Sequence, residues 1–149
     1  MFNKIFGFTG ISKREKEANS LLNILVVDDS EIDRTLIGYI LKKAGYNVFY
    51  AIDGKSGLDA VKSNHIDLIL LDCQMPLMGG VEMCRILKSD EHLKGIPVIF
   101  VTGIDTPVNV INCFEASAEN FIIKPVNQRA ILKHIKSAIA VNQTAKENK

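Results

Sequence analysis

The chain has 149 residues, a length that suits one domain with a single hydrophobic core. Its residues are 47% hydrophobic and 23% charged, and a net charge of +1 gives no general attraction to nucleic acid, so no direct nucleic-acid binding is expected. Three cysteines without a Cys-x-x-Cys pair, and no apolar stretch near the ~20 residues that span a bilayer, predict a cytoplasmic protein without a transmembrane segment.

Strand-like and helix-like segments alternate along the chain from Asn23 onward. The first strand is predicted at residues 23–27, and the helix after it begins at the N-cap Ser30 and ends at Gly45. Further strands are predicted at residues 47–52, 67–72, 97–102 and 121–124, and further helices at about residues 55–63, 81–88, 107–116 and 128–141. Five β-α units in strict alternation predict an α/β fold, with a doubly wound parallel sheet covered by five helices.

Polar residues stand at the C-terminal ends of these apolar strands, or one position beyond. They are Asp28, Asp29, Asp72, Thr102 and Lys124. Open α/β sheets bind ligands beyond the carboxyl ends of their strands, and in the flavodoxin-like strand order 2-1-3-4-5 the ends of strands 1, 3 and 4 are neighbours. Clustered carboxylates repel one another unless a cation is present, and a set of oxygen ligands favours Mg²⁺. A carboxylate beside such an ion can attack phosphorus, while the lysine and threonine would bind phosphoryl oxygens.

Four short motifs follow one another in a characteristic order. They are VVDDS at 26–30, DCQMP-x-M-x-G at 72–80, VTG at 101–103 and the pair Lys124-Pro125. Through these motifs, the segment from about Leu22 to Val141 resembles a receiver domain of a two-component response regulator, of the stand-alone kind that resembles chemotaxis regulators. The resemblance divides the chain into an N-terminal extension (1–21), a receiver domain (22–141) and a polar C-terminal tail (142–149).

The resemblance also implies the ligands of the metal ion and the residue that is phosphorylated. Asp72 would be the phosphoacceptor. Asp29, Asp72 and the backbone carbonyl of Gln74 would bind Mg²⁺ directly, while Asp28 would mostly hold a metal-bound water. The metal site would therefore include all three aspartates.

Three residues are implied to transmit phosphorylation to the protein surface. Thr102 would be the switch hydroxyl, Lys124 would pair with the phosphoryl group, and Phe121 occupies the aromatic switch position. The chain departs from the common pattern in having Gly103 after the threonine, where alanine is usual, and Val126 after Lys-Pro, where phenylalanine is frequent. Because Phe121 lacks the hydroxyl of the commoner tyrosine, its movement would depend on packing alone.

The expected function is a phosphorylation-dependent signalling switch. A sensor histidine kinase or a histidine phosphotransfer protein would give its phosphoryl group to Asp72 in a Mg²⁺-dependent reaction, and the altered surface would regulate a downstream protein partner or support a phosphorylation-dependent dimer. The chain would not be an enzyme acting on a metabolite; at most it would catalyse its own phosphorylation and dephosphorylation. Two alternatives remain: an unphosphorylated interaction module with the same fold, and an FMN carrier or phosphatase. An FMN carrier would need a Ser/Thr/Gly loop after the first strand, where this chain is acidic.

The N-terminal extension is the segment that the resemblance explains least. Phe2, Ile5 and Phe6 have the i, i+3, i+4 spacing of one helical face. A flexible or loosely docked tail and a helix that docks on a partner or on a membrane surface are the interpretations left open.

Overall fold

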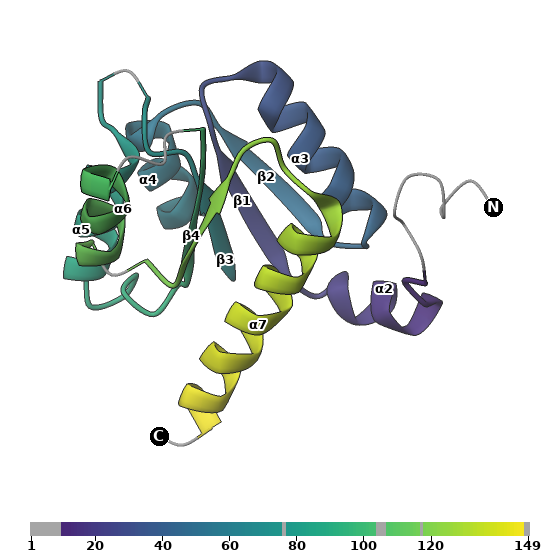
Figure 1. Ribbon diagram of the computed structural model, residues 1–149. Helices are drawn as coiled ribbons and strands as arrows, with labels where there is room; N and C mark the ends of the chain where they lie inside the picture. The colour runs from purple at the N-terminus through teal and green to yellow at the C-terminus, as the bar shows by residue number, and fades with distance from the viewer. Residues whose placement is uncertain (1–9, 76, 104–106, 117, 148–149) are drawn as a thin grey trace.

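The computed structural model describes residues 10–75, 77–103, 107–116 and 118–147. Within these ranges the chain forms one five-stranded parallel sheet with helices on both faces (Figure 1). The strands are β1 (Asn23–Val27), β2 (Asn47–Ala51), β3 (Leu68–Leu71), β4 (Val98–Thr102) and β5 (Asn120–Ile123). Their order, β2-β1-β3-β4-β5, confirms the doubly wound sheet predicted from the sequence.

The strands are followed by five helices. These are α3 (Glu31–Lys43), α4 (Gly54–Ser63), α5 (Gly80–Ser89), α6 (Pro107–Glu115) and α7 (Gln128–Glu147). The last helix continues beyond the predicted end at Val141 because residues 142–147 contain no glycine or proline to stop it. In the described part of the chain, none of the helices has both the length and the apolar character needed to cross a bilayer.

A sixth helix, α2 (Lys13–Asn19), precedes the sheet, so the prediction of five helices was wrong by one for the described residues. Its start is fixed by a capping box: the Ser12 hydroxyl accepts from the Glu15 amide at 3.1 Å, and the Glu15 carboxylate accepts from the Ser12 amide at 3.2 Å. The apolar residues near the N-terminus for which a helical face was considered, Phe2, Ile5 and Phe6, lie outside the described residues.

The three central strands of the sheet, β1, β3 and β4, are buried on both faces, whereas the outer strands β2 and β5 are partly exposed. Alternate residues of β1 point to opposite sides, so that Ile24 packs with the apolar residues of α3 and α7, while Leu25 packs with those of α4, α5 and α6. Figure 1 shows the same two layers of helices around the central strands. Burial on both faces explains why these central strands are almost continuous apolar runs, since each fully buried Leu or Ile contributes roughly 1.5–3 kcal/mol.

The parallel register brings the carboxyl ends of the central strands to one edge. Val27 of β1 pairs with Leu71 of β3, and Leu71 pairs with Phe100 of β4. The residue after β3 remains in the ladder, because the Asp72 amide donates to the Val27 carbonyl at 2.9 Å. We call this edge, with the loops that follow β1, β3, β4 and β5, the carboxyl edge.

The opposite edge, which we call the amino edge, is held mainly by side-chain amides. Asn23 and Asn47 are the first residues of β1 and β2, and their side chains donate to the carbonyls of His65 and Ser20, each at 2.7 Å. Helix α2 docks here through the buried Asn19, whose amide donates to the carbonyl of Ala44 at 2.7 Å. Neutral hydrogen bonds therefore join α2 to the end of α3 and to the start of β2.

One lysine connects the other segments of the amino edge. The Lys88 ammonium, near the end of α5, donates to the carbonyls of Ile96 at 2.8 Å and Lys94 at 3.3 Å, and pairs with a Glu119 carboxylate oxygen at 3.1 Å. The other carboxylate oxygen of Glu119 accepts from the amide of Val98, the first residue of β4. The positive charge of Lys88 is thus matched by one carboxylate and two carbonyls.

Candidate functional site

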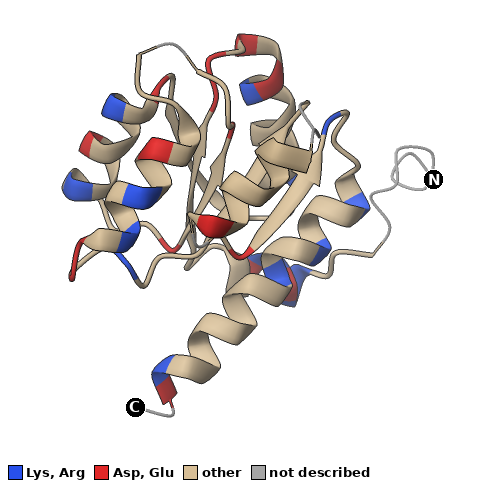
Figure 2. Cartoon of the chain, turned by 60° about the vertical axis from the view of Figure 1, so that its left-hand side comes forward, with Lys and Arg blue, Asp and Glu red and all other residues tan. Residues whose placement is uncertain are grey.

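Three aspartates meet at the carboxyl edge. Asp28 and Asp29 follow β1 and Asp72 follows β3, and each offers a carboxylate oxygen such that these oxygens lie within 4.8 Å of one another. The side chains of Asp28 and Asp72 are buried, whereas Asp29 is exposed. Figure 2 shows acidic residues gathered where β1 leads into α3. The structure thus brings together residues 44 positions apart in sequence, as the strand ends predicted.

The turn after β1 fixes the orientation of Asp28. Its Oδ1 accepts from the Ser30 amide at 2.9 Å, and its backbone carbonyl accepts from the Arg34 guanidinium at 2.8 Å. Ser30 also caps α3, since its hydroxyl accepts from the Asp33 amide at 3.3 Å. We call the site formed by the carboxylates of Asp28, Asp29 and Asp72 together with Lys124 the acidic pocket. The contacts of Asp28 leave its second carboxylate oxygen free to bind Lys124 in this pocket.

Lys124 binds three carboxylates from three different segments. Its Nζ lies 2.8 Å from Asp28 Oδ2, 2.9 Å from Asp33 Oδ2 and 3.5 Å from Asp72 Oδ2. Burial alone would lower the pKa of Lys124, but its hydrogen bonds to Asp28 and Asp33 and the charge of Asp72 outweigh burial and raise the pKa. The lysine is therefore firmly protonated, and its two shortest contacts are not to Asp72.

Sequence reasoning missed Asp33. It lies in the first turn of α3, and its hydrogen bond to Lys124 is the main reason that its pKa is lowered, against the opposing effect of burial. The pattern Ser30-x-x-Asp33 shows that this aspartate belongs to the first turn of the helix, near the pocket. It does not show that a lysine beyond β5 reaches it, because that contact depends on a long side chain crossing between segments.

The negative charge of Asp72 is disfavoured by its surroundings. Burial and the neighbouring Asp28 charge raise its pKa, while Lys124, the Thr102 hydroxyl and the Gln74 amide act in the opposite direction through attraction and hydrogen bonds. The Gln74 amide lies 3.4 Å from Asp72 Oδ1. Among the ion pairs of the described residues, those with these pocket carboxylates involve only Lys124. Negative charge therefore exceeds positive charge in the pocket.

This donor set fits a hard divalent cation. Three carboxylates supply oxygen ligands only, and Lys124 is the one cation paired with the carboxylates of Asp28 and Asp72 among the described residues, so Mg²⁺ would neutralise the remaining negative charge. A metal that prefers sulfur fits less well, because Cys73 contacts the Cys113 sulfur at 2.9 Å instead. The predicted role of the Gln74 carbonyl stays a prediction.

The two predicted switch residues lie on β4 and β5, the two strands beyond β3 in the sheet. Thr102 is buried at the end of β4, and its carbonyl accepts from the Lys124 amide at 2.9 Å. Phe121 is partly buried in β5 and packs against the cluster that contains Cys113 of α6. The peptide bond between Lys124 and Pro125 is cis. Thr102 thus lies beside Asp72, whereas Phe121 packs on the side of the sheet that α6 covers.

Gly80 allows the loop after β3 to approach the pocket closely. Its amide donates to the Cys73 carbonyl at 3.0 Å, and a Cβ at this position would collide with the backbone carbonyl of Asp72. A residue with a side chain would therefore push the start of α5 away from the end of β3.

The buried cysteines behave as packing residues. Cys73 and Cys113 are in contact, and Cys84 donates to the Ala116 carbonyl at 3.1 Å. Burial raises the pKa of all three thiols, to about 11 for Cys84, so little reactive thiolate forms near neutral pH.

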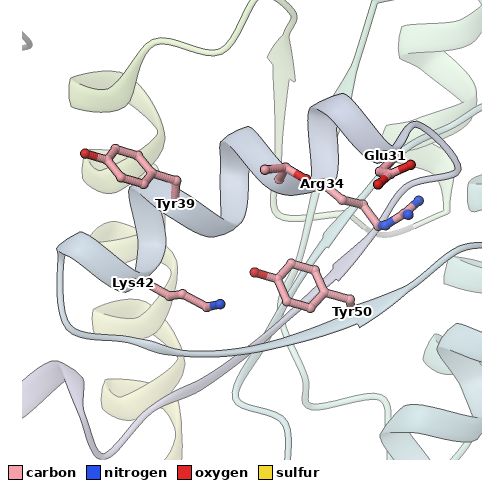
Figure 3. Close-up of a pocket in the computed structure, with 6 residues that line it drawn as sticks. Glu31, Arg34, Tyr39, Lys42 and Tyr50 are labelled. Carbon is pink, nitrogen blue, oxygen red and sulfur yellow. The ribbon is translucent and has the colours of Figure 1, made fainter.

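A separate hollow of about 560 Å³ lies on the outer side of α3 and β2. Figure 3 shows Lys42 and Tyr50 facing each other across it, and the ammonium lies 5.5 Å from the centre of the tyrosine ring. Its lining residues do not include the aspartates of the acidic pocket, and its long side chains are open to solvent. We therefore assign the chemistry of the chain to the acidic pocket.

Comparison with known proteins agrees with this assignment. Residues 24–136 match the family model of the response regulator receiver domain. The chain belongs to this family. The acidic pocket lies at the same place in the fold that the motifs of the receiver domain predicted, beyond the carboxyl ends of β1 and β3.

Receiver domains in different kinds of protein are similar to this one. The chain is 35% identical over 105 residues to the two-component response regulator ORR3 of Oryza sativa subsp. indica, covering 70% of this chain and 80% of that protein. It is 37% identical over 113 residues to the CAI-1 autoinducer sensor kinase/phosphatase CqsS of Vibrio cholerae, covering 75% of this chain but only 16% of that protein. The receiver domain of the sensor histidine kinase PA1611 from Pseudomonas aeruginosa PAO1 has a TM-score of 0.75 at 25% identity, covering 80% of this chain and 98% of that one, and contains a magnesium ion in its active site cleft.

Proposed function

We propose that this receiver domain is a phosphorylation-dependent switch in which Asp72 accepts the phosphoryl group. The observation that carries the proposal is the buried carboxylate of Asp72, with Asp28 and Asp29 on one side and the Lys124 ammonium 3.5 Å away. An oxygen of Asp72 would form a bond to the phosphorus of a phosphohistidine, and the bond from phosphorus to the imidazole nitrogen would break. The imidazole would leave and take up a proton.

Asp28, Asp29 and Asp72 would hold Mg²⁺ during this transfer, together with the Gln74 carbonyl. When bound, the ion would neutralise charge on the carboxylates and on the phosphoryl oxygens. The excess of negative charge in the pocket and the magnesium ion of the PA1611 receiver domain support this role. Asp28 would keep its orientation through the Ser30 amide whether or not the ion is bound.

Lys124 and Thr102 would bind the phosphoryl group and change position in response to it. Lys124 would turn one of its N–H donors from a carboxylate to a phosphoryl oxygen, and the Thr102 hydroxyl, which binds Asp72 here, would bind another. Movement of Thr102 would leave space for Phe121 and change the surface formed by α6, β5 and α7. That surface already exposes apolar side chains suited to a protein partner, namely Val108, Ile111, Phe114 and Ile123.

The partners would stand on either side of this switch in a cytoplasmic signalling pathway. A sensor histidine kinase or a histidine phosphotransfer protein would supply the phosphoryl group, as membership in the receiver-domain family implies. A downstream protein or a second phosphorylated copy would bind the altered surface. The similarity to part of a sensor kinase and to a separate response regulator supports the first partner.

Phosphorylation with acetyl phosphate and Mg²⁺, followed by mass spectrometry of the intact protein, tests the proposal. Wild type should gain one phosphoryl group and Asp72→Asn none, and chelation of Mg²⁺ should prevent the reaction. Asp59→Asn, an exposed position on α4, is the matched control and should react like wild type. The proposal fails if wild type stays unmodified under conditions that modify other receiver domains, or if Asp72→Asn keeps the added group.

A further inference from the structure

Asp33 shares the lysine of the pocket without belonging to the candidate metal site. Its Oδ2 lies 2.9 Å from Lys124 Nζ, but among the described residues the group able to hold one metal ion consists of Asp28, Asp29 and Asp72. We infer that Asp33 is a positioning residue that holds Lys124 away from the phosphoryl site in the unphosphorylated protein and so weakens the binding of a phosphoryl group. This inference rests on the proposed function of Asp72.

The geometry of Lys124 shows why its hydrogen bond to Asp33 competes with its binding of a phosphoryl group. An ammonium group has three N–H donors, and two of them are used at 2.8 and 2.9 Å by Asp28 and Asp33. The third reaches Asp72 Oδ2 only at 3.5 Å. For the ammonium to move onto a phosphoryl group carried by Asp72, at least one of its two short contacts has to lengthen.

Asp33 is the contact that the protein can release at the lower cost. The side chain of Asp28 is only 2% exposed and is also fixed by the Ser30 amide, so without the lysine it would remain a buried charge. The side chain of Asp33 is 34% exposed and can be hydrated again. It also lies at the N-terminus of α3, where the helix dipole stabilises a carboxylate without Lys124.

The direction of the effect follows from the state in which the ion pair exists. A contact that is present in the unphosphorylated state and lost in the phosphorylated state favours the former by its own free energy. For a partly exposed ion pair, this corresponds to about a two- to fivefold change in an equilibrium constant. Asp33 would thus set how readily the switch is turned on, although it touches neither the metal ion nor the phosphoryl group.

Beryllofluoride, a mimic of the phosphoryl group, allows the inference to be tested as a binding affinity. It is titrated into the full chain at Mg²⁺ concentrations that saturate each variant, because loss of a nearby negative charge also weakens Mg²⁺ binding, and backbone NMR signals report occupancy. Asp33→Asn should bind about two- to fivefold more tightly than wild type. Asp33→Glu, which restores the charge, should return toward the wild-type affinity. Glu31→Gln removes an exposed charge from the same turn of α3 and should have no such effect.

A second series of variants, all of which carry Lys124→Met, separates an effect that Asp33 exerts through Lys124 from a direct effect of the Asp33 charge. In the Lys124→Met background, Asp33→Asn should no longer tighten beryllofluoride binding; a gain that persists there, or an equal gain in Glu31→Gln, overturns the positioning role. If the Lys124→Met proteins bind too weakly to titrate, a double-mutant cycle for urea unfolding without Mg²⁺ decides, and absence of coupling between positions 33 and 124 overturns the inference. Failure of wild type to bind beryllofluoride contradicts the proposed function instead.

Discussion

The two edges of the sheet use the same kind of contact for different purposes. At the amino edge, Lys88 binds two backbone carbonyls and the Glu119 carboxylate, and neighbouring segments are joined by neutral amides such as Asn19. At the carboxyl edge, Lys124 binds three carboxylates, so negative charge remains in excess. A lysine that bridges segments is therefore balanced by its partners at the amino edge. At the carboxyl edge the partners of the lysine carry more negative charge than it neutralises, so a further cation can bind.

Removal of the Lys124 ammonium should have the largest effect on this contrast. Without Mg²⁺ we expect Lys124→Met to lower the free energy of unfolding by about 3 kcal/mol, because Asp28 and Asp72 would then be buried without a positive partner. Urea unfolding measures the loss, and saturating Mg²⁺ should recover most of it. Lys136→Met, which removes an exposed pair with Glu15, should cost less than about 1 kcal/mol. Equal losses in the two variants would contradict the contrast.

Replacement of Asp72, the proposed phosphoacceptor, by a neutral residue should have the opposite effect on stability. We expect Asp72→Asn to raise the free energy of unfolding at pH 7 without Mg²⁺, since it removes a buried carboxylate whose pKa is raised by burial and by the charge of Asp28. Addition of Mg²⁺ should shrink the advantage, because only wild type gains the ion's full stabilisation. If Asp72→Asn were less stable than wild type without Mg²⁺, the negative and positive charges of the acidic pocket would already be balanced in the wild type.

At the amino edge, loss of a polar contact should destabilise the fold without affecting the pocket. Asn19→Ala should lower the free energy of unfolding by about 1–2 kcal/mol, because the buried Ala44 carbonyl loses its side-chain donor. Mg²⁺ affinity, measured by calorimetry, should stay unchanged. Asn64→Ala removes an exposed amide that also binds a backbone carbonyl and serves as the control, with a smaller loss expected. A change in Mg²⁺ affinity in Asn19→Ala would mean that the two edges are coupled.

The smallest expected effect concerns a buried phenol at the amino edge. Burial, aided by the Glu15 charge, raises the pKa of Tyr46 from 10.0 to about 12. The unfolded chain therefore loses its phenolic proton first, so stability contributed by Tyr46 is present below pH 10 and falls as the pH rises toward 12, by about 1 kcal/mol at pH 11. Urea unfolding from pH 9 to 11 should show a shallower decline in Tyr46→Phe than in the exposed control Tyr39→Phe. If the free energy of unfolding declined equally in both variants, the Tyr46 phenol would be exposed to solvent rather than buried.

The sequence predicted the parts of the molecule that depend on local pattern. Each strand is an apolar run with a clear boundary, and a parallel sheet places residues after such runs on one edge, so the meeting of Asp28, Asp29 and Asp72 could be foreseen. Helix α2 carried a local signal too, because the capping box of Ser12 and Glu15 is visible in the sequence as Ser-x-x-Glu, although no helix was predicted there. The Asp33–Lys124 pair had no local signal, because it joins two segments 91 residues apart through flexible side chains.

Gly80 affects the shape of the acidic pocket independently of its charged side chains. Because a Cβ there would collide with the Asp72 carbonyl, β3 and α5 lie closer together than a residue with a side chain would allow. Gly80→Ala would lengthen this distance while every carboxylate and lysine stays in the chain. Replacement of an aspartate changes charge and shape together, whereas this glycine offers a way to change the shape of the pocket alone.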